Sequence, residues 1–449
     1  MKRHSVAVIT VIVIFLVIGG IGALFYYNGP TNNTSKINDS VKKHISASYQ
    51  LIQPSDLEYM GAFRLPDSSG DKGWVWAGNE MGALAYYPHG DSKGANDGYP
   101  GSLYGTGNDQ YKYISEVNIP TPVVSGEKNL NDLNTATTLQ DFEDILGHKL
   151  QGKELPKLGL TYLESQGEQE NGKLYYCYGE HIQDEEKIPS HGWFDLDLSN
   201  PQLQGDWKIG DKLNLLTTYY LFNINKEWAD IYTPGKYLAT GRFRDGGQGS
   251  QGPSLYAYGP WNEGNPPASG TKLSYVTLLE YSSVTDSESH VMDRYSHSDE
   301  WNGGAWLASG SRSSVLFLGT KGMGNTWYGF SDGTKWPTSG EGPFPPVPGI
   351  SPTFYGEDLR GWWSDRFQAE ILFYDPSDLA AVANGTMKPY EPQPYATLNI
   401  DQYLFNLQSS KQKDRVGAVA YDSQHGFLYV SEPLADGNKP IIHVWKLKK

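Results

Sequence analysis

The residues with the clearest capacity for chemistry are acidic side chains contributed by four separate parts of the chain. The candidates for catalysis are Glu80, Asp109, Glu180 and Glu432. Hydrolysis of a glycosidic bond needs two carboxylates that face each other across a cleft, about 5–9.5 Å apart according to the stereochemistry. Because the four candidates lie far apart in the sequence, only the fold can bring them together. No catalytic signature of a glycosidase surrounds them, so binding is favoured over hydrolysis.

A second group of side chains suits the binding of a polar ligand. Cationic and amide groups donate hydrogen bonds to hydroxyl and carboxylate oxygens, and tryptophan rings offer flat apolar faces of the kind on which sugar rings stack. The candidates for ligand binding are Lys157, His181, Arg242, Arg244, Asn302, Lys321, Trp362, Trp363 and Arg415. The alternative is that the tryptophans are buried to hold together a long proline-rich loop, expected over 331–366, and that the polar groups only line a water-filled channel. Both interpretations stay open from the sequence.

One cysteine and one acidic loop limit the metal chemistry that the chain can support. Cys177 stands alone in the apolar run 174–178, so it excludes a disulfide framework and a cysteine-ligated metal, and we predict that its side chain is buried. The loop 286–293 carries oxygen ligands suited to calcium, but their irregular spacing favours a solvated acidic loop. No metal and no cofactor are therefore expected, with calcium as the alternative.

The elements that must position these residues form an internal repeat, which returns five times along the chain. Each copy has a strand of small residues, an aromatic-rich strand and a strand of alternating polarity. The clearest copy is the last, with segments 417–422, 426–430 and 441–445, and the other copies begin near residues 82, 159, 228 and 304. A fourth, outer strand is available for three copies, at 206–209, 275–279 and 395–399.

The last copy lacks a fourth strand, whereas the segment 57–65, ahead of the first copy, has no sheet of its own. An N-terminal strand that completes the last sheet would close a ring and remove the open edge that a linear array leaves. We therefore predict closure by this strand. A single helix is predicted over 138–146, where apolar residues recur at helical spacing.

Strands of the form Gly-Ala-Val-Ala-Tyr-Asp (417–422), followed by Gly-Phe-Leu-Tyr-Val-Ser (426–431), resemble the blades of NHL-type and YVTN-type β-propellers. The resemblance covers about residues 55–449 and implies an all-β fold, a single propeller of five blades, with six as the alternative because the fourth interval is long. Five is also the blade number of arabinanase-like and invertase-like glycosidases. In a propeller the starts of the first strands and the ends of the second strands share one face, where the candidate residues fall.

The N-terminus predicts a membrane anchor. Residues 5–27 are uncharged and would span about 33 Å as a helix, which matches a hydrocarbon core of about 30 Å. Basic residues precede this run, so the chain that follows it is expected outside the cytoplasm. The predicted order is a cytoplasmic stub at 1–4, a transmembrane signal anchor at 5–27, a flexible stalk at 28–50 and the propeller at 51–449, in a single-pass protein of the cell membrane. The positions that match the N-glycosylation pattern are Asn32, Asn33, Asn38 and Asn384.

Three functions are compatible with these features. A net charge of -15 argues against a nucleic-acid partner, which would need a basic surface. The preferred hypothesis is a membrane-anchored extracytoplasmic propeller that binds a carbohydrate or an extracellular protein at its loop-rich face. The alternatives are a propeller glycoside hydrolase acting on extracellular polysaccharide and a structural cell-surface scaffold.

Overall fold

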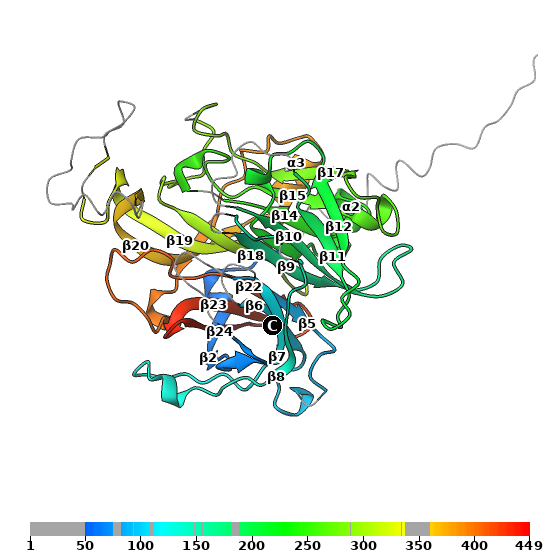
Figure 1. Ribbon diagram of the computed structural model, residues 1–449. Coiled ribbons are helices and arrows are strands. Elements are labelled where there is room, and N and C mark those ends of the chain that lie inside the picture. Colours follow the sequence, from blue (N-terminus) through cyan, green and yellow to red (C-terminus); the bar gives the residue numbers. More distant parts are fainter. Residues whose placement is uncertain are drawn as a thin grey trace, which may run out of the picture. The chain divides into compact units, whose positions relative to one another are not determined.

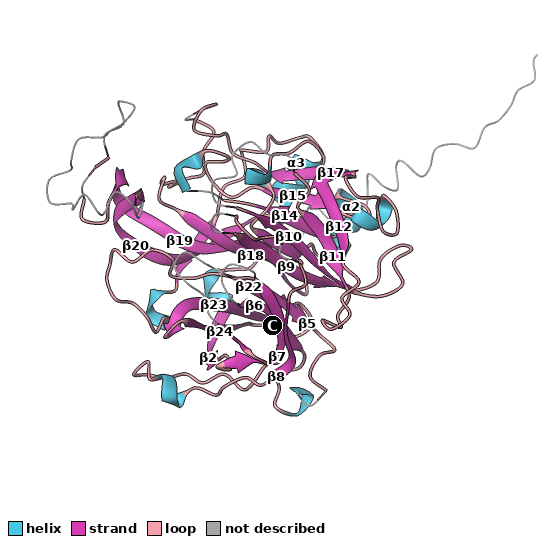
Figure 2. Ribbon diagram, in the orientation of Figure 1, coloured by secondary structure: helices cyan, strands magenta, loops and turns pink. Residues whose placement is uncertain are grey.

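Five β-sheets stand around a central axis in the computed structural model (Figure 1). Strands dominate and the helices are short (Figure 2). The structure describes residues 50–74, 82–92, 94–107, 112–147, 149–153, 156–180, 188–243, 245–287, 289–333, 335–336 and 360–449. The innermost strands of the sheets touch in the order β5, β9, β13, β18, β22 and back to β5, so the ring is closed.

Each sheet is one blade, and its strands are given from the innermost outward. Blade 1 has β5 (Leu84–Tyr87), β6 (Ser102–Gly107), β7 (Tyr113–Asn118) and β8 (Thr138–Glu143). Blade 2 has β9 (Lys157–Leu163), β10 (Lys173–Gly179), β11 (His191–Phe194) and β12 (Gln204–Ile209), with β16 (Lys272–Leu273) added in parallel. Blade 3 has β13 (Tyr220–Asn223), β14 (Leu238–Gly241), β15 (Leu255–Tyr258) and β17 (Tyr275–Leu279).

The last two blades each use a strand from the start of the chain. Blade 4 has β18 (Glu300–Ser309), β19 (Arg312–Gly329), β20 (Gly361–Tyr374) and β21 (Ala396–Asn399), and β1 (Gln50–Leu51) pairs in parallel with β19. Blade 5 has β22 (Val419–Asp422), β23 (Phe427–Asp436), β24 (Lys439–Leu447) and β2 (Leu57–Arg64). Outside the blades lie the hairpin β3 (Ser68–Ser69) and β4 (Lys72–Gly73) and the helices α2 (Lys226–Tyr232) and α3 (Pro376–Ala383).

Small residues on the innermost strands allow five strands to converge. A Cβ added to Gly303 would lie 2.4 Å from Val419 on the next blade, and one added to Gly304 would lie 2.6 Å from the ring of Phe222 on the preceding blade. Larger apolar side chains therefore occur further out, where each pair of neighbouring blades encloses its own layer of core.

The N-terminal strand closes the ring, as predicted. β2 pairs antiparallel with β24 from Leu57 opposite Leu447 to Arg64 opposite Ile441, and in Figure 1 the blue strand lies beside the red one. The five-bladed count is confirmed as well. The buried state of Cys177 is confirmed: its side chain is 0% exposed, and burial raises the pKa of the thiol to about 12.

Two predicted elements are wrong. The helix expected over 138–146 is instead the strand β8, because its residues alternate between half-buried and exposed and pair with β7. The segment near Trp228, taken as the first strand of the third copy, is the helix α2, where the Asn225 side chain accepts a hydrogen bond from the Trp228 amide and caps the first turn. β13 is the strand that fills that place.

The long loop expected over 331–366 ends earlier than predicted, because β20 begins at Gly361. β19 and β20 extend as a paired ribbon, so Trp362 and Trp363 belong to β20 and lie opposite Tyr328 and Trp327.

The membrane helix has no counterpart in the part of the chain that the structure covers. No helix among those residues is long and apolar enough to span a bilayer. The run 5–27 and the stalk lie outside the described residues. Asn384 is described, and it is exposed at the end of α3.

Candidate functional site

The five innermost strands run in the same direction along the central axis. Residues early in these strands line a narrow middle section, and later residues line a pocket at one end. The opposite end, where the strands begin, is the face on which the candidate residues were predicted. We call this end the mouth and define it by Lys112, Lys157, Glu180, Tyr219, Arg242, Glu300, Lys413 and Asp414.

On one side of the mouth, two cations share a tyrosine ring. The Arg242 guanidinium lies 4.2 Å from the centre of the Tyr219 ring and the Lys157 ammonium lies 5.6 Å from it. Arg242 also donates hydrogen bonds to the Tyr219 hydroxyl at 3.1 Å and to the Glu180 carbonyl at 2.9 Å. Because Arg242 is fully buried, these contacts hold its charge in one place.

Lys112 belongs to the same cationic group. Its side chain is 3% exposed, and burial together with the neighbouring Lys157 holds the pKa of its ammonium well below the ordinary value. Glu180 contributes a carboxylate nearby, 3.6 Å from the Lys153 ammonium.

Two carboxyl groups meet on the other side of the mouth. Burial and the adjacent Glu300, which also hydrogen-bonds to it, raise the pKa of Asp414 to about 7, although Lys413 and Lys157 oppose this rise. Lys413 lies 3.6 Å from the Glu300 carboxylate. Two carboxyl groups this close cannot both ionise easily, so the charge of Glu300 adds to the effect of burial on the pKa of Asp414.

The backbone of Asp414 is unusual. Its φ angle is 55°, in the left-handed region that costs free energy for most residues, and its Oδ1 atom is buried with no hydrogen-bond partner among the described residues. Strained backbone clusters at functional sites, so Asp414 is a candidate functional residue. A group of this kind can donate or accept a proton near neutral pH.

The structure covers only part of the predicted catalytic set. Glu80 and Asp109 lie outside the described residues, as do the predicted ligand-binding residues His181 and Arg244. Glu180 lies at the mouth. Glu432 is 2% exposed, and its side chain makes contacts within the protein. Its carboxylate accepts hydrogen bonds from the backbone amides of Phe405 and Asn406 and contacts His443 on β24 of blade 5.

Three of the predicted ligand-binding residues make internal contacts. Lys321 forms a buried ion pair with Asp299, whose pKa burial raises to about 6. Arg415 pairs with Asp401 at 2.7 Å, and the Asn302 amide donates to the Val416 carbonyl at 3.4 Å. Lys157 and Arg242, in contrast, lie at the mouth.

The two tryptophans have different neighbours. Trp362 stacks on His297 with a ring separation of 4.4 Å. The Trp363 ring lies 5.3 Å from the ammonium of Lys413, which in turn contacts Glu300, so this ring borders the mouth. Both side chains are half-buried.

Sequence reasoning missed five of the mouth residues: Lys112, Tyr219, Glu300, Lys413 and Asp414. The prediction used one residue from each copy, two positions before its start. For the last copy that residue is Arg415, so Asp414, which directly precedes it, was not considered. Tyr219 was missed because the first strand of blade 3 was placed too late in the chain. Counting every charged residue within four positions of the predicted start of each copy would have included both acids.

The described residues also bear on the calcium alternative. Within the described ranges, no group of three or more histidine, cysteine or acidic side chains could hold a metal ion. In the acidic loop, the Asp286 carboxylate accepts a hydrogen bond from the Ser283 hydroxyl at 2.7 Å. Calcium therefore has no described site.

Comparisons with known proteins assign this chain to no family. No protein-family model matches the chain, and no curated protein matches it. The likeness to NHL-type and YVTN-type blades therefore rests on the strand pattern, whereas the five-bladed architecture rests on the structure.

Proposed function

We propose that this chain is a membrane-anchored extracytoplasmic propeller that binds a carbohydrate at the mouth. One observation carries the proposal: the mouth gathers cations, carboxyl groups and aromatic rings from different blades around one end of the axis. A sugar offers hydroxyl groups that both donate and accept hydrogen bonds, and carbon–hydrogen faces that pack on aromatic rings. Trp363 and Tyr219 supply the rings, while Arg242, Lys157 and Asp414 supply donors and acceptors.

The membrane anchor in this proposal is supported by the sequence alone. An uncharged run of anchor length follows Lys2 and Arg3, and no other basic residue occurs before Lys36. This arrangement favours an N-terminus in the cytoplasm and a propeller outside it.

Glycoside hydrolysis is the second candidate, and the carboxyl pair favours it. A general acid needs a pKa near the operating pH, and burial together with Glu300 raises the pKa of Asp414 to about 7. Asp414 hydrogen-bonds to Glu300, so these two carboxyl groups are closer together than the 5–9.5 Å that the reaction requires. The second catalytic group would therefore be a carboxylate other than Glu300. Glu180 is the described residue suited to that role.

Binding is tested with the full-length protein on an array of neutral and acidic glycans. Trp363→Ala should weaken binding to any hit by on the order of 1–3 kcal/mol, as expected for a buried aromatic contact. Tyr237→Ala is the matched control, because its ring packs on Trp261 beside α2 rather than at the mouth. Equal affinities for these two variants would contradict binding at the mouth.

Hydrolysis is tested on the same hits by measuring the release of reducing ends. Glu180→Gln should leave the affinity intact and abolish turnover if this residue is an acid, base or nucleophile. Binding without any released product would leave the protein as a carbohydrate binder. No binding to any glycan would reject both carbohydrate functions and favour a partner protein or a scaffold role.

A further inference from the structure

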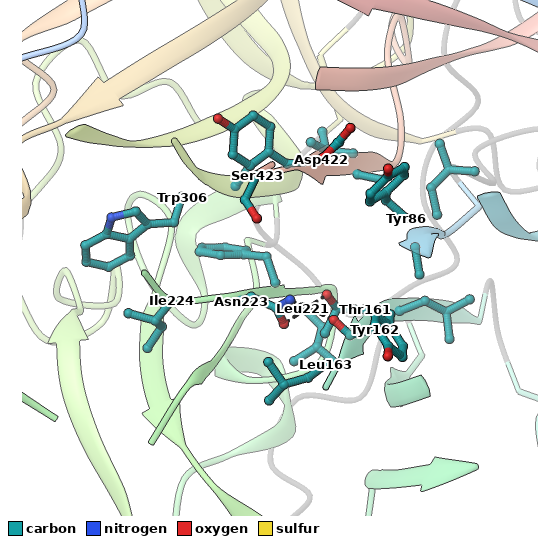
Figure 3. Close-up of a pocket in the computed structure, with 18 of the residues that line it drawn as sticks. Tyr86, Thr161, Tyr162, Leu163, Leu221, Asn223, Ile224, Trp306, Asp422 and Ser423 are labelled. Carbon is teal, nitrogen blue, oxygen red and sulfur yellow. Dashed lines mark hydrogen bonds between the residues drawn. The ribbon is translucent and has the colours of Figure 1, made fainter. Parts of the chain in front are cut away.

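A pocket of about 250 Å³ lies at the end of the axis opposite the mouth. All five innermost strands contribute to it: four of them also through residues that follow the strand, and β18 through Gly304, Ala305 and Trp306 in its middle. In Figure 3, Trp306, Ser423, Asp422 and Tyr86 lie on one side, and Asn223, Thr161 and Tyr162 lie on the other. None of these residues was a candidate from the sequence.

The pocket is separated from the mouth by a narrow section of the axis. The free volume there is about 10 Å³, which is about the space that one water molecule needs. The innermost strands pack closely at this level: a Cβ on Gly159 would lie 2.8 Å from the Cys177 sulfur and 3.1 Å from the Leu221 amide. A ligand therefore cannot pass between the two ends, so the pocket is a separate compartment.

The inner surface of the pocket is apolar. Leu84, Leu160, Leu221 and Val419 form its floor, and all four side chains are buried. A sugar that reached this floor would leave buried hydroxyl groups without hydrogen bonds, which is unfavourable. The floor therefore selects an apolar group.

Aromatic residues form the walls. The rings of Tyr86, Tyr162 and Trp306 are each less than a tenth exposed, and other contacts hold each of them in place. The Trp306 indole donates to Ser313, the Tyr86 hydroxyl donates to the Pro100 carbonyl, and the Tyr162 ring packs edge-on against Tyr87. Fixed rings favour a second aromatic ring in face or edge contact.

The polar groups lie at the rim. The Asn223 amide accepts from the Thr161 hydroxyl at 3.3 Å and donates to the Tyr162 carbonyl at 2.7 Å, which leaves one amide hydrogen free to donate. Ser423 and Gln424 are exposed, and neither side chain makes a hydrogen bond to another described residue. These groups can bind a polar substituent that remains at the opening.

We infer that this pocket binds a small aromatic molecule of one or two rings that carries a hydroxyl or N–H group. The ring enters toward the leucine floor, and the polar substituent remains beside Asn223 and Ser423. The volume is adequate, because an apolar cavity of about 150 Å³ admits benzene. The combination of an apolar floor and a polar rim is compatible with a small-molecule site.

The experiment measures binding of p-cresol and of indole to the full-length protein by isothermal titration calorimetry or ligand-observed NMR. Both probes are expected to bind at one site per chain, and D-glucose is expected not to compete. Ser423→Trp places a large side chain at the opening without altering the core, and it should weaken binding of both probes at least tenfold. Gln424→Trp is the second variant if Ser423→Trp lowers the melting temperature.

Trp363→Ala at the mouth is the matched control and should leave binding of p-cresol and indole unchanged. The inference is overturned if neither probe binds, if the rim variants bind them as the unaltered protein does, or if glucose displaces them. Glycan binding at the mouth is measured separately, so failure of one site leaves the other proposal standing.

Discussion

The carboxyl pair at the mouth predicts a stability effect that depends on pH. Asp414→Asn removes the ionisable group but keeps its size, and asparagine tolerates the left-handed backbone that this position requires. The folded protein raises the pKa of Asp414 from 3.8 to about 7, so between these values the folded state binds more protons than the unfolded state. Stability is therefore greatest at acidic pH and falls as the pH rises toward 7.

The size of the effect follows from the same shift. A rise of this extent in the pKa of Asp414 corresponds to about 4 kcal/mol at most, and we halve it to about 2 kcal/mol because this pKa also depends on the neighbouring charges of Glu300, Lys413 and Lys157. Asp414→Asn should therefore raise the free energy of unfolding by about 2 kcal/mol at pH 8. At pH 4 the change should be close to zero.

Urea unfolding of both proteins at pH 4, 6 and 8 measures this difference. Asp211→Asn is the matched control, because this aspartate is exposed in an ion pair with Lys272, and it should show less than about 0.5 kcal/mol at any pH. Lower stability of Asp414→Asn at pH 8 would refute the reasoning. It would show that attraction to Lys413 and Lys157 outweighs burial and the repulsion from Glu300.

Three further outcomes are expected. Phe63→Ala on the closing strand should lower the free energy of unfolding by about 3–5 kcal/mol in one cooperative transition. Val124→Ala, at an exposed site, is the control and should change the free energy of unfolding little. A separate early transition would contradict closure of the whole ring. Lys321→Met should cost about 3–5 kcal/mol in urea unfolding because it leaves the Asp299 carboxylate buried and unpaired, and a neutral result would argue against the pair. In fractionated cells the full-length protein should remain with membranes and be released by proteolysis in the stalk, and recovery of soluble protein that lacks only residues 1–27 would refute the anchor.

Much of the fold could be predicted because its signals are local. A blade needs a strand of small residues near the axis and aromatic strands further out, and both appear as short patterns along the chain. The missing fourth strand of the last copy and the spare segment at 57–65 together predicted the closure by β2. The errors occurred where a local pattern was ambiguous: residues 138–143 contain apolar spacings that fit a helix, but pairing with β7 makes them a strand.

The candidate site was harder to predict, because the direction of a side chain depends on its neighbours. Lys157 and Arg242 lie at the mouth, and each flanks a strand that the pattern identified. Glu432 also ends a second strand, yet its carboxylate contacts His443 on β24 and the backbone at Phe405 and Asn406. Residues on a strand alternate between its two faces, so a position at a strand end does not determine which neighbours it contacts.

The sequence by itself determined the all-β class, the five repeats and the closing strand. These properties follow from residue types and from spacing within short segments. Only the tertiary structure decided that Glu300 and Asp414 meet, because they come from different blades that the closed ring brings together. It alone revealed the aromatic pocket, because that volume is left between the ends of five strands distant in the sequence, and no single segment encodes it.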